Sequence, residues 1–524
     1  MSRTRTRWYL LGLVLILAVA AVVLSVALRS NRVVAGSAAP ASGESTTAPT
    51  TPPTDSSAPS SPASTDASTP PPNIAPDGII GAESAGDPYY PESGNAGYDV
   101  ASYQVSLSFE PAKRLLVATT TIVATATAPG KLGRFSFDLQ PTMQVSTVTV
   151  DGAMAGHTQH DAKLVITPTA GIATGRSMTV VVSYSGKPGP IAGGVAGLSD
   201  GGWYTTRGGG AAALGEPFSA SAWYPANEHP TDRAAFSVIA EVPSEWKVIS
   251  NGLPIAADLP SAPAGYATFG WSEKSEMATY LTTIYIEKFT MTQDSSGGIP
   301  VINAYGPGAT DYQQIGDKTA EYIDFLASKF GPYPFDAAGG IYLADPLGFA
   351  LESQTRPIYA GFANESVVVH ELAHQWFGDD VSLHRWADVC LNECFASYAE
   401  WLWAENNGET LDDTYRAQID QNKDQAGFWK VPLIDMGAGN EFGVVYVRGP
   451  LAMHALRAEL GDEKFSELML SWVEEHTGKS ASWADFAQLV SQLAGKDESA
   501  FLNAWFVQTG VPADQYLYPG KLHP

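Results

Sequence analysis

The sequence predicts an α+β protein of several domains, in which a β-rich domain precedes a mainly helical one. Three observations support this prediction. The chain has 524 residues, more than one ordinary domain holds. From about Tyr98 to Thr290, apolar and polar residues alternate with period two, and Gly and Pro separate the runs, as is typical of strands. After about Pro300 the pattern changes, and the last part of the chain has mainly helical spacing.

Residues 1–35 are predicted to be a cytoplasmic Arg-rich tail followed by a transmembrane anchor. Arg3, Arg5 and Arg7 precede an uncharged run of 21 residues, Trp8–Leu28, which is long enough to span a bilayer. Basic residues before such a run favour a cytoplasmic N-terminus. A cleaved signal peptide is the alternative. Both interpretations predict export of the remaining chain, which is then either single-pass in the cell membrane or secreted.

Residues 36–90 are predicted to be a disordered linker. The stretch Gly36–Pro76 consists mostly of Ser, Thr, Pro and Ala, and it contains no aromatic residue, Lys or Arg. Such a composition cannot bury a hydrophobic core. We expect an extended tether that gives the following domains reach from a membrane, although an unselected spacer has the same composition.

Residues 91–295 are expected to form a domain of many antiparallel strands, and residues 296–524 a mainly helical domain. In the first, Tyr103, Val105 and Leu107 alternate with polar residues, which predicts a strand with one buried face. In the second, the Ser482-Trp483-Ala484-Asp485 segment has the spacing of a capping box at the start of a helix.

A metal site is predicted from the segment His370-Glu371-Leu372-Ala373-His374. Residues 367–378 are expected to form a helix capped by Asn364. Histidines four residues apart share a helix face, so both imidazoles can bind one ion. Glu371 then lies beside the ion rather than on it, where a general base for water belongs.

A third ligand is expected from Glu393, eighteen residues after His374, on a second helix predicted over Ala387–Asn406. The resulting His₂Glu set leaves one zinc position open, as catalytic zinc requires. We therefore predict one Zn²⁺ per chain. The alternative is a polar helix face with two satisfied histidines. It is disfavoured because both segments are apolar, and unpaired His and Glu are costly there.

The charge of the chain argues against nucleic acid as a partner. The formal net charge is −25, and because the first 32 residues carry five Arg and no acid, the remainder carries −30. Such a surface repels nucleic acid and anionic lipid and attracts cationic substrates. Solubility alone explains most of these charges.

The two cysteines of the chain, Cys390 and Cys394, lie four residues apart on the helix expected to carry Glu393. Their Cα atoms are expected within disulfide reach, but side-chain directions in a helix make such a bond strained. They cannot converge on one ion together with Glu393, because they point to different sides of the helix. We interpret them as packing residues.

Taken together, these residues make the sequence similar to the aminopeptidase N family of gluzincin metallopeptidases (peptidase family M1), over about residues 95–515. The segment Phe349-Ala350-Leu351-Glu352-Ser353 lies where the family has its Gly-x-Met-Glu-Asn exopeptidase motif, and Tyr446-Val447-Arg448-Gly449 is similar to its Tyr-x-Lys-Gly segment. Gly215-Glu216-Pro217 and the run 223–230 resemble the β-domain signature of short, actinobacterial-type members. Cys390 and Cys394 depart from the family, which usually has Trp and Gly at these positions.

The resemblance implies an N-terminal antiparallel β-saddle domain followed by a thermolysin-like, mainly helical zinc peptidase domain. It also implies that Glu352 and Glu216 bind the substrate's α-ammonium, with Phe349 and Ala350 close to the first side-chain pocket. The alternative for both glutamates is an ordinary surface acid, which for Glu216 is suggested by the composition of its Gly/Pro loop.

The resemblance further implies that Glu371 is the general base and that Tyr446 hydrogen-bonds the oxyanion, whereas the residues alone favour a core tyrosine at position 446. Glu400 lies seven residues after Glu393 and hence on the same helix face. It is expected to orient a ligand histidine, and a solvated helix position is the alternative.

The predicted function is a zinc-dependent aminopeptidase that removes N-terminal residues from peptides at the cell surface or outside the cell. Its partners are peptides with a free N-terminus and, through the N-terminal helix, a membrane that leaves the catalytic region extracellular. One alternative is a zinc endopeptidase with an open cleft. Another is a non-catalytic surface binding protein, which the intact Glu371 disfavours because ligands alone suffice for a structural metal.

Overall fold

The computed structural model describes residue 75 and residues 78–195, 199–255, 257 and 259–523. The expected anchor, residues 1–35, and most of the expected linker lie outside the described residues. All described residues belong to one compact unit. Among them, no helix is both long enough and apolar enough to cross a membrane.

The β-rich half is built on an eight-stranded sheet. Strands β14 and β2 pair in parallel, and the other neighbours in this sheet are antiparallel. In β2 the side chains of Tyr103, Val105 and Leu107 are buried while Gln104 and Ser106 are exposed, as the period-two pattern predicts. In sheet order the strands are β16 (Leu253–Pro254), β17 (Tyr266–Met277), β14 (Ala234–Pro243), β2 (Tyr98–Glu110), β3 (Leu115–Ala126), β10 (Ser177–Gly186), β5 (Met143–Val150) and β6 (Ala153–Met154).

Two five-stranded sheets complete this half. The first contains β1 (Ile79–Ile80), β4 (Lys131–Asp138), β8 (Lys163–Thr167), β7 (Gly156–His160) and β9 (Ile172–Ala173). The second contains β11 (Pro190–Val195), β12 (Ser199–Thr205), β13 (Ala211–Leu214), β18 (Ile284–Glu287) and β15 (Lys247–Ser250). Strand β13 ends just before the loop that carries Glu216.

A third five-stranded sheet opens the second half of the chain. Strands β20, β21 and β23 are parallel in that order, and β22 pairs antiparallel with β23 at the edge. Because β22 ends at Leu351, this edge presents Glu352. The strands are β19 (Thr290–Ser296), β20 (Ile299–Tyr305), β21 (Ala338–Leu343), β23 (Ile358–Ala360) and β22 (Ala350–Leu351).

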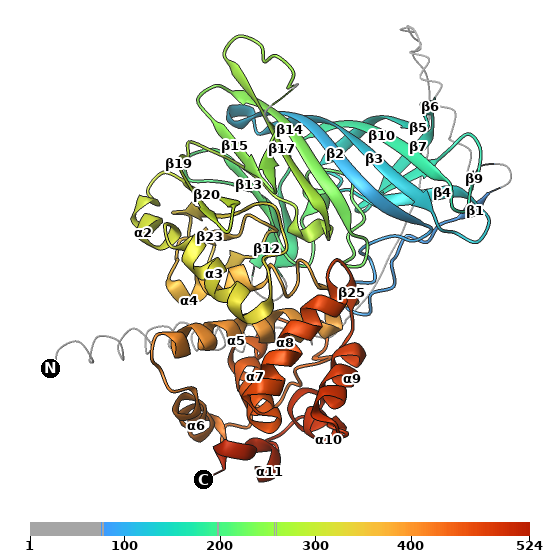
Figure 1. Ribbon diagram of the computed structural model, residues 1–524. Helices are drawn as coiled ribbons and strands as arrows, with labels where there is room; N and C mark the ends of the chain where they lie inside the picture. Colours follow the sequence, from blue (N-terminus) through green and yellow to red (C-terminus); the bar gives the residue numbers. More distant parts are fainter. Residues whose placement is uncertain (1–74, 76–77, 196–198, 256, 258, 524) are drawn as a thin grey trace, which may run out of the picture. The chain divides into compact units, whose positions relative to one another are not determined.

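Helices form the rest of this half (Figure 1). The Ser482 capping box is confirmed: Ser482 N donates to the Asp485 carboxylate at 2.9 Å, and Asp485 N donates to Ser482 Oγ at 3.4 Å. Helix α5 packs against both α4 and α7. The helices are α2 (Gln313–Gly316), α3 (Thr319–Phe330), α4 (Glu365–Ala373), α5 (Cys390–Asn406), α6 (Leu411–Asn422), α7 (Val445–Leu460), α8 (Asp462–His476), α9 (Trp483–Ala494), α10 (Ser499–Leu502) and α11 (Asp514–Leu517). Two short strands, β24 (Ser382–Leu383) and β25 (Ser480–Ala481), pair in parallel among these helices.

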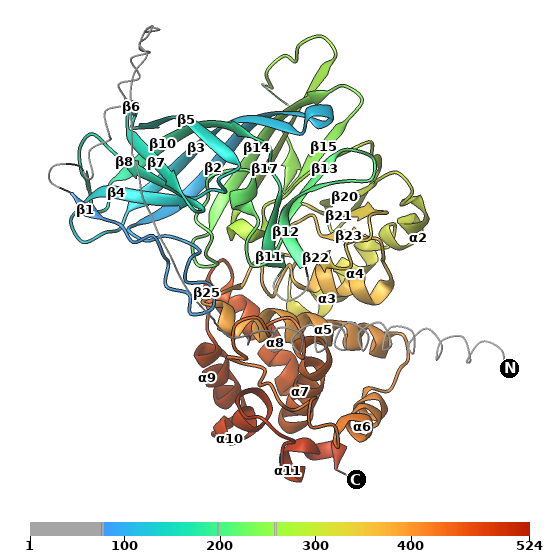
Figure 2. The same ribbon diagram turned by 180° about the vertical axis from the view of Figure 1, so that it is seen from behind.

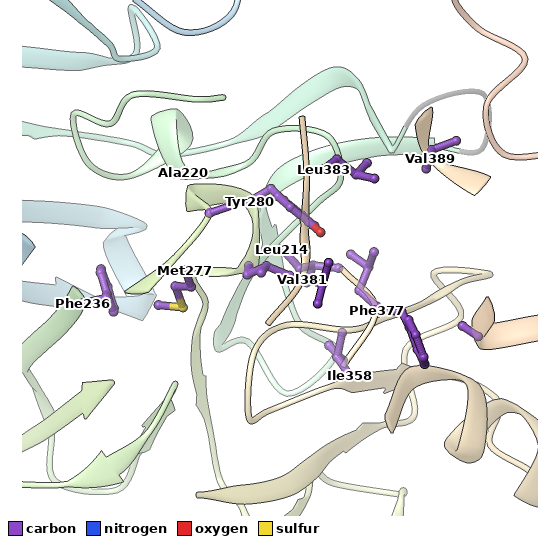
Figure 3. Close-up of a cluster of buried hydrophobic side chains, with 14 of the residues drawn as sticks. Leu214, Ala220, Phe236, Met277, Tyr280, Ile358, Phe377, Val381, Leu383 and Val389 are labelled. Carbon is purple, nitrogen blue, oxygen red and sulfur yellow. The ribbon is translucent and has the colours of Figure 1, made fainter. Parts of the chain in front are cut away.

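A continuous apolar core joins the two halves. Figure 3 shows Leu214, at the end of β13, and Tyr280 together with Phe377 and Val381, which follow α4. All four are buried. Because Leu214 lies two residues before Glu216, this shared core fixes the Glu216 loop relative to the segment that follows the predicted metal helix.

The end of the expected linker is ordered, so the prediction of disorder up to residue 90 is wrong for residues 78–90. Strand β1 pairs with β4. The Asp87 carboxylate is buried and accepts a hydrogen bond from Trp386 N at 2.9 Å. Composition suggested mobility, but the aromatic and acidic side chains here find partners that lie far away in the sequence.

Candidate active site

Helix α4 carries the first part of the site. The Asn364 side chain caps it by accepting a hydrogen bond from Val367 N at 3.1 Å, as predicted. The helix ends at Ala373 rather than near residue 378, because the backbone tightens: Gln375 N bonds to the carbonyl three residues before it. His374 keeps helical dihedral angles, φ −57° and ψ −24°, so its imidazole still shares a face with that of His370.

The structure brings His370, His374 and Glu393 together. His370 Nε2 lies 3.1 Å from His374 Nε2 and 3.2 Å from a Glu393 carboxylate oxygen. His374 Nε2 lies 3.5 Å from the same oxygen. Ligand atoms about 2.0–2.2 Å from a tetrahedral zinc lie about 3.4 Å apart. These three buried groups therefore fit one zinc ion and leave a fourth position open.

The outer nitrogen of each imidazole has a partner that orients the ring. His370 Nδ1 lies 2.9 Å from the Glu400 carboxylate, and His374 Nδ1 lies 3.0 Å from the Phe377 carbonyl oxygen. Both partners accept hydrogen bonds, so each Nδ1 carries a proton and each Nε2 lone pair is free for a metal. Ser366 also donates to Glu400.

Electrostatic interactions within this cluster favour an ionised Glu393 carboxylate next to positively charged imidazoles. Burial alone would raise the pKa of the Glu393 carboxyl, but His374 and His370 outweigh it and lower this pKa to about 2. Burial likewise opposes the charged form of His374, yet attraction by Glu393 raises its pKa to about 9. Burial also opposes the charged form of His370, but the hydrogen bonds that Glu393 and Glu400 accept from its ring raise its pKa well above the usual value. A divalent cation bound here would neutralise the Glu393 carboxylate in place of the extra protons on the two imidazoles.

Glu371 lies on α4 between the two histidines and is 7% exposed. Burial raises the pKa of its carboxyl to about 8, against the opposing effect of the two imidazoles. A bound cation would oppose this shift further. Without a cation, the Glu371 carboxyl therefore binds a proton more readily than an exposed glutamate does.

Glu216 and Glu352 are both buried and lie within electrostatic range of this cluster, although they come from different halves of the chain. Each has one carboxylate oxygen, Oε1, without a hydrogen-bond partner among the described residues. Burial, followed by Glu352 and Glu393, raises the pKa of Glu216 well above its usual value. Burial and Glu393 raise that of Glu352, against the opposing effect of His374. Figure 2 shows β22, which leads into Glu352, beside α4.

The remaining predicted residues border this site. Tyr446 is the second residue of α7 and is 37% exposed, and its ring centre lies 5.9 Å from that of His370. It is thus not the core tyrosine that the residues alone favoured. Phe349, just before β22, is buried, and Ala350, the first residue of β22, is half-buried; they lie three and two residues before Glu352.

Sequence reasoning missed two buried groups near these carboxylates. Neither carboxylate oxygen of Asp379 has a hydrogen-bond partner among the described residues, and burial followed by Glu352 raises its pKa well above the usual value. The Tyr280 hydroxyl also lacks such a partner, and its pKa is raised by burial, Glu352 and Glu216. The available signal for Asp379 was a pair of adjacent acids, Asp379 and Asp380, directly after the predicted metal helix.

The interpretation of Cys390 and Cys394 as packing residues requires correction, because the structure joins them in a disulfide. Their Cα atoms are 4.8 Å apart. The two residues lie four apart in the first turn of α5, and their Cα separation is within the range that disulfides span. Gly449 packs so closely that a Cβ there would lie 2.8 Å from Cys394 Sγ.

A His-Glu-x-x-His helix and a glutamate from the following helix define the gluzincin class of zinc site. Comparison with known proteins agrees. A family model described as the Peptidase family M1 domain matches residues 339–505. These residues, which include His370, His374 and Glu393, form a peptidase family M1 domain.

Relatives and solved structures support the assignment. "Probable aminopeptidase 2" of Sulfurisphaera tokodaii is 27% identical over 57% of this chain and 41% of the relative. "Leucyl aminopeptidase" of Saccharolobus solfataricus is 25% identical, with the same two shares. The chain thus spans about two fifths of the length of these curated relatives. An M1 zinc metallopeptidase structure from Deinococcus radiodurans is 28% identical with a TM-score of 0.74, and the match covers 82% of this chain and 99% of that one.

The predicted fold class is confirmed by these neighbours, which include a two-domain M1 zinc metallopeptidase with a TM-score of 0.75 and 27% identity. The β domain is followed by a thermolysin-like, mainly helical domain. The predicted cofactor, one zinc ion, agrees with neighbours that are zinc metallopeptidases.

Proposed function

We propose that the chain is a zinc-dependent aminopeptidase. One observation carries this proposal: Glu216 and Glu352 are buried within electrostatic range of the zinc-site residues, and each has an oxygen without a hydrogen-bond partner among the described residues. Buried carboxylates without partners are costly unless a ligand satisfies them. The α-ammonium of a peptide has the charge and the hydrogen-bond donors to do so.

Each residue of the site has its own role in the proposed reaction. When bound, zinc acts as a Lewis acid that polarises the scissile carbonyl and makes water more acidic. The Glu371 carboxylate accepts the proton of the attacking water and passes it to the leaving amine. The Tyr446 hydroxyl donates a hydrogen bond to the oxygen on which negative charge develops. Glu216 and Glu352 hold the ammonium, so that only the first peptide bond reaches the metal.

Neighbouring structures support peptides as substrates. One M1 zinc metallopeptidase from Deinococcus radiodurans was solved bound to a Tyr-ser-ala substrate, and a two-domain M1 zinc metallopeptidase was solved bound to L-arginine. A tripeptide with a free N-terminus and a free amino acid share the α-ammonium that the two glutamates would hold here.

Hydrolysis of a free tripeptide and of its N-acetylated form tests the proposal. We expect cleavage of the free peptide alone, and Glu352→Gln should lower that activity by at least tenfold. The exposed Glu467 supplies the control variant, Glu467→Gln, which should change nothing. Equal cleavage of both peptides would instead support an endopeptidase. Zinc binding without any hydrolysis would support a non-catalytic binding protein.

We also propose that the catalytic region acts outside the cytoplasm, held by the N-terminal segment. The Arg-flanked apolar run Trp8–Leu28 supports this, and so does the Cys390–Cys394 disulfide, because disulfides persist in oxidising compartments. Protease treatment of intact cells that express the full chain provides the test. Resistance of the catalytic region until the cells are lysed would contradict the proposal.

A further inference from the structure

A loop at the edge of the candidate active site links the two halves of the chain. This loop, residues 82–93, is here called the strap. Both of its ends are fixed in the β-rich half: Gly81 N donates to a β4 carbonyl oxygen at 2.8 Å, and Gly94 N donates to the Asp138 carboxylate at 3.1 Å. The strap is therefore a loop anchored at both ends.

The middle of the strap reaches the helical half through side-chain hydrogen bonds. Asp87 accepts from Trp386 N at 2.9 Å. The Tyr89 hydroxyl donates to the Asp435 carboxylate at 2.7 Å and accepts from Gly437 N at 2.7 Å. These contacts hold the segment before α7 against the strap.

Tyr90 contacts three segments, each of which leads to a residue of the proposed mechanism. Its ring packs edge-on against Phe218, two residues after Glu216, with ring centres 5.6 Å apart. It packs likewise against Trp386, in the turn before α5, at 6.2 Å. Its hydroxyl donates to Glu441, in the loop before α7, at 2.9 Å.

The Tyr90–Glu441 hydrogen bond lies in a sheltered, acidic environment. Glu441 is 1% exposed, and its second oxygen has no partner among the described residues. Burial, Glu441 and Glu216 all raise the pKa of the Tyr90 phenol. The phenol therefore keeps its proton and donates a hydrogen bond to the Glu441 carboxylate, and Glu216 lies within electrostatic range of it.

We propose that Tyr90 is a positioning residue that fixes the Glu216 loop relative to Tyr446. The inference rests on the aminopeptidase function proposed above. Tyr90 contacts the Glu216 loop through Phe218. It contacts the segment before Tyr446 through Glu441, which lies five residues before Tyr446. A substrate's ammonium and scissile carbonyl are separated by a fixed set of bonds. A shift of the Glu216 loop relative to Tyr446 therefore misaligns the scissile carbonyl without releasing the amine. Small misplacements of this kind lower the reaction rate strongly.

Steady-state kinetics with leucine 4-nitroanilide test the inference on the full, zinc-loaded chain. Tyr90→Phe keeps the ring and removes the bond to Glu441. We expect it to lower kcat about tenfold and to change KM less than about twofold. Tyr266→Phe is a matched control, because the Tyr266 hydroxyl donates to Glu110 at 2.8 Å in the β-rich half. It should leave both constants unchanged.

A double variant separates positioning from a merely structural role. If Tyr90 acts through Tyr446, then Tyr90→Phe should cause no further loss in a Tyr446→Phe background, while zinc content and melting temperature match those of Tyr266→Phe. The inference would be overturned if the losses of the two single variants multiplied in the double variant. It would also be overturned if Tyr90→Phe had the same kinetics as Tyr266→Phe, or if its loss of activity came with lower zinc content and melting temperature. An inactive wild-type chain would overturn the proposed function and this inference together. An active wild type matched by Tyr90→Phe would overturn only the inference.

Discussion

Glu371 lies next to the zinc ligand His370 in the chain, yet the proposed mechanism gives it a different task from that of a ligand. We expect Glu371→Gln to keep the zinc content and to lower kcat about 10²- to 10⁴-fold, because an amide cannot accept the water's proton. Metal analysis and kinetics on the same sample check this. The exposed Glu474 provides Glu474→Gln as the control, and retained activity in Glu371→Gln would exclude its role as the base.

Glu400 is expected to affect zinc binding indirectly, through the ligand His370. Its carboxylate lies 2.9 Å from His370 Nδ1 and so holds the ring that presents Nε2 to the metal. Glu400→Ala should weaken zinc binding about 10- to 100-fold. Competition with a zinc-binding dye measures this affinity, and Glu409→Ala, at an exposed position three residues after the end of the same helix, is the control. Equal zinc affinity in both variants would mean that Glu400 is only a solvated neighbour.

At the scale of the element, the disulfide closes the first turn of α5 around Glu393. A bond that closes so short a loop contributes about 2 kcal/mol to the free energy of unfolding in the chain-entropy account. We expect the double variant Cys390→Ala/Cys394→Ala to lose about that much in urea titrations. A phosphine reductant should lower the stability of the wild type and leave the double variant unchanged. If the reductant affects both equally, the disulfide is not the cause.

At the scale of the whole molecule, buried acids make stability depend on pH. Burial raises the pKa of Glu228, Asp232 and Glu273 to about 7 each, whereas the unfolded chain has ordinary values near 4. Between these values the folded state binds more protons than the unfolded state. The free energy of unfolding therefore falls as pH rises from about 4 to about 7.

Melting temperatures of the zinc-loaded protein at pH 5 and pH 7.5 check this dependence. We expect the higher value at pH 5. Glu273→Gln should reduce the difference, because an amide does not titrate, while Glu474→Gln should not. A melting temperature that rises from pH 5 to pH 7.5 would show that the stabilising contribution of other groups outweighs these three acids.

The zinc triad could be predicted because most of its geometry is local. Helical periodicity places His370 and His374 on one face, and an apolar run marks the helix that carries Glu393. Period two likewise predicted the buried face of β2. The strap could not be predicted, because Asp87 and Tyr90 follow a linker-like stretch and their partners lie about 300 residues away.

The sequence by itself predicted the helix face shared by His370 and His374, the apolar helix that carries Glu393, and the order of a β domain before a helical one, because periodicity and composition along the chain report these features. Only the tertiary structure decided that Glu216 and Glu352 lie buried within electrostatic range of the same site, that the cysteines bond, and that residues 78–90 are ordered. The physical reason is that burial and hydrogen bonding depend on which distant segments pack together. Residue type and spacing along the chain do not state this.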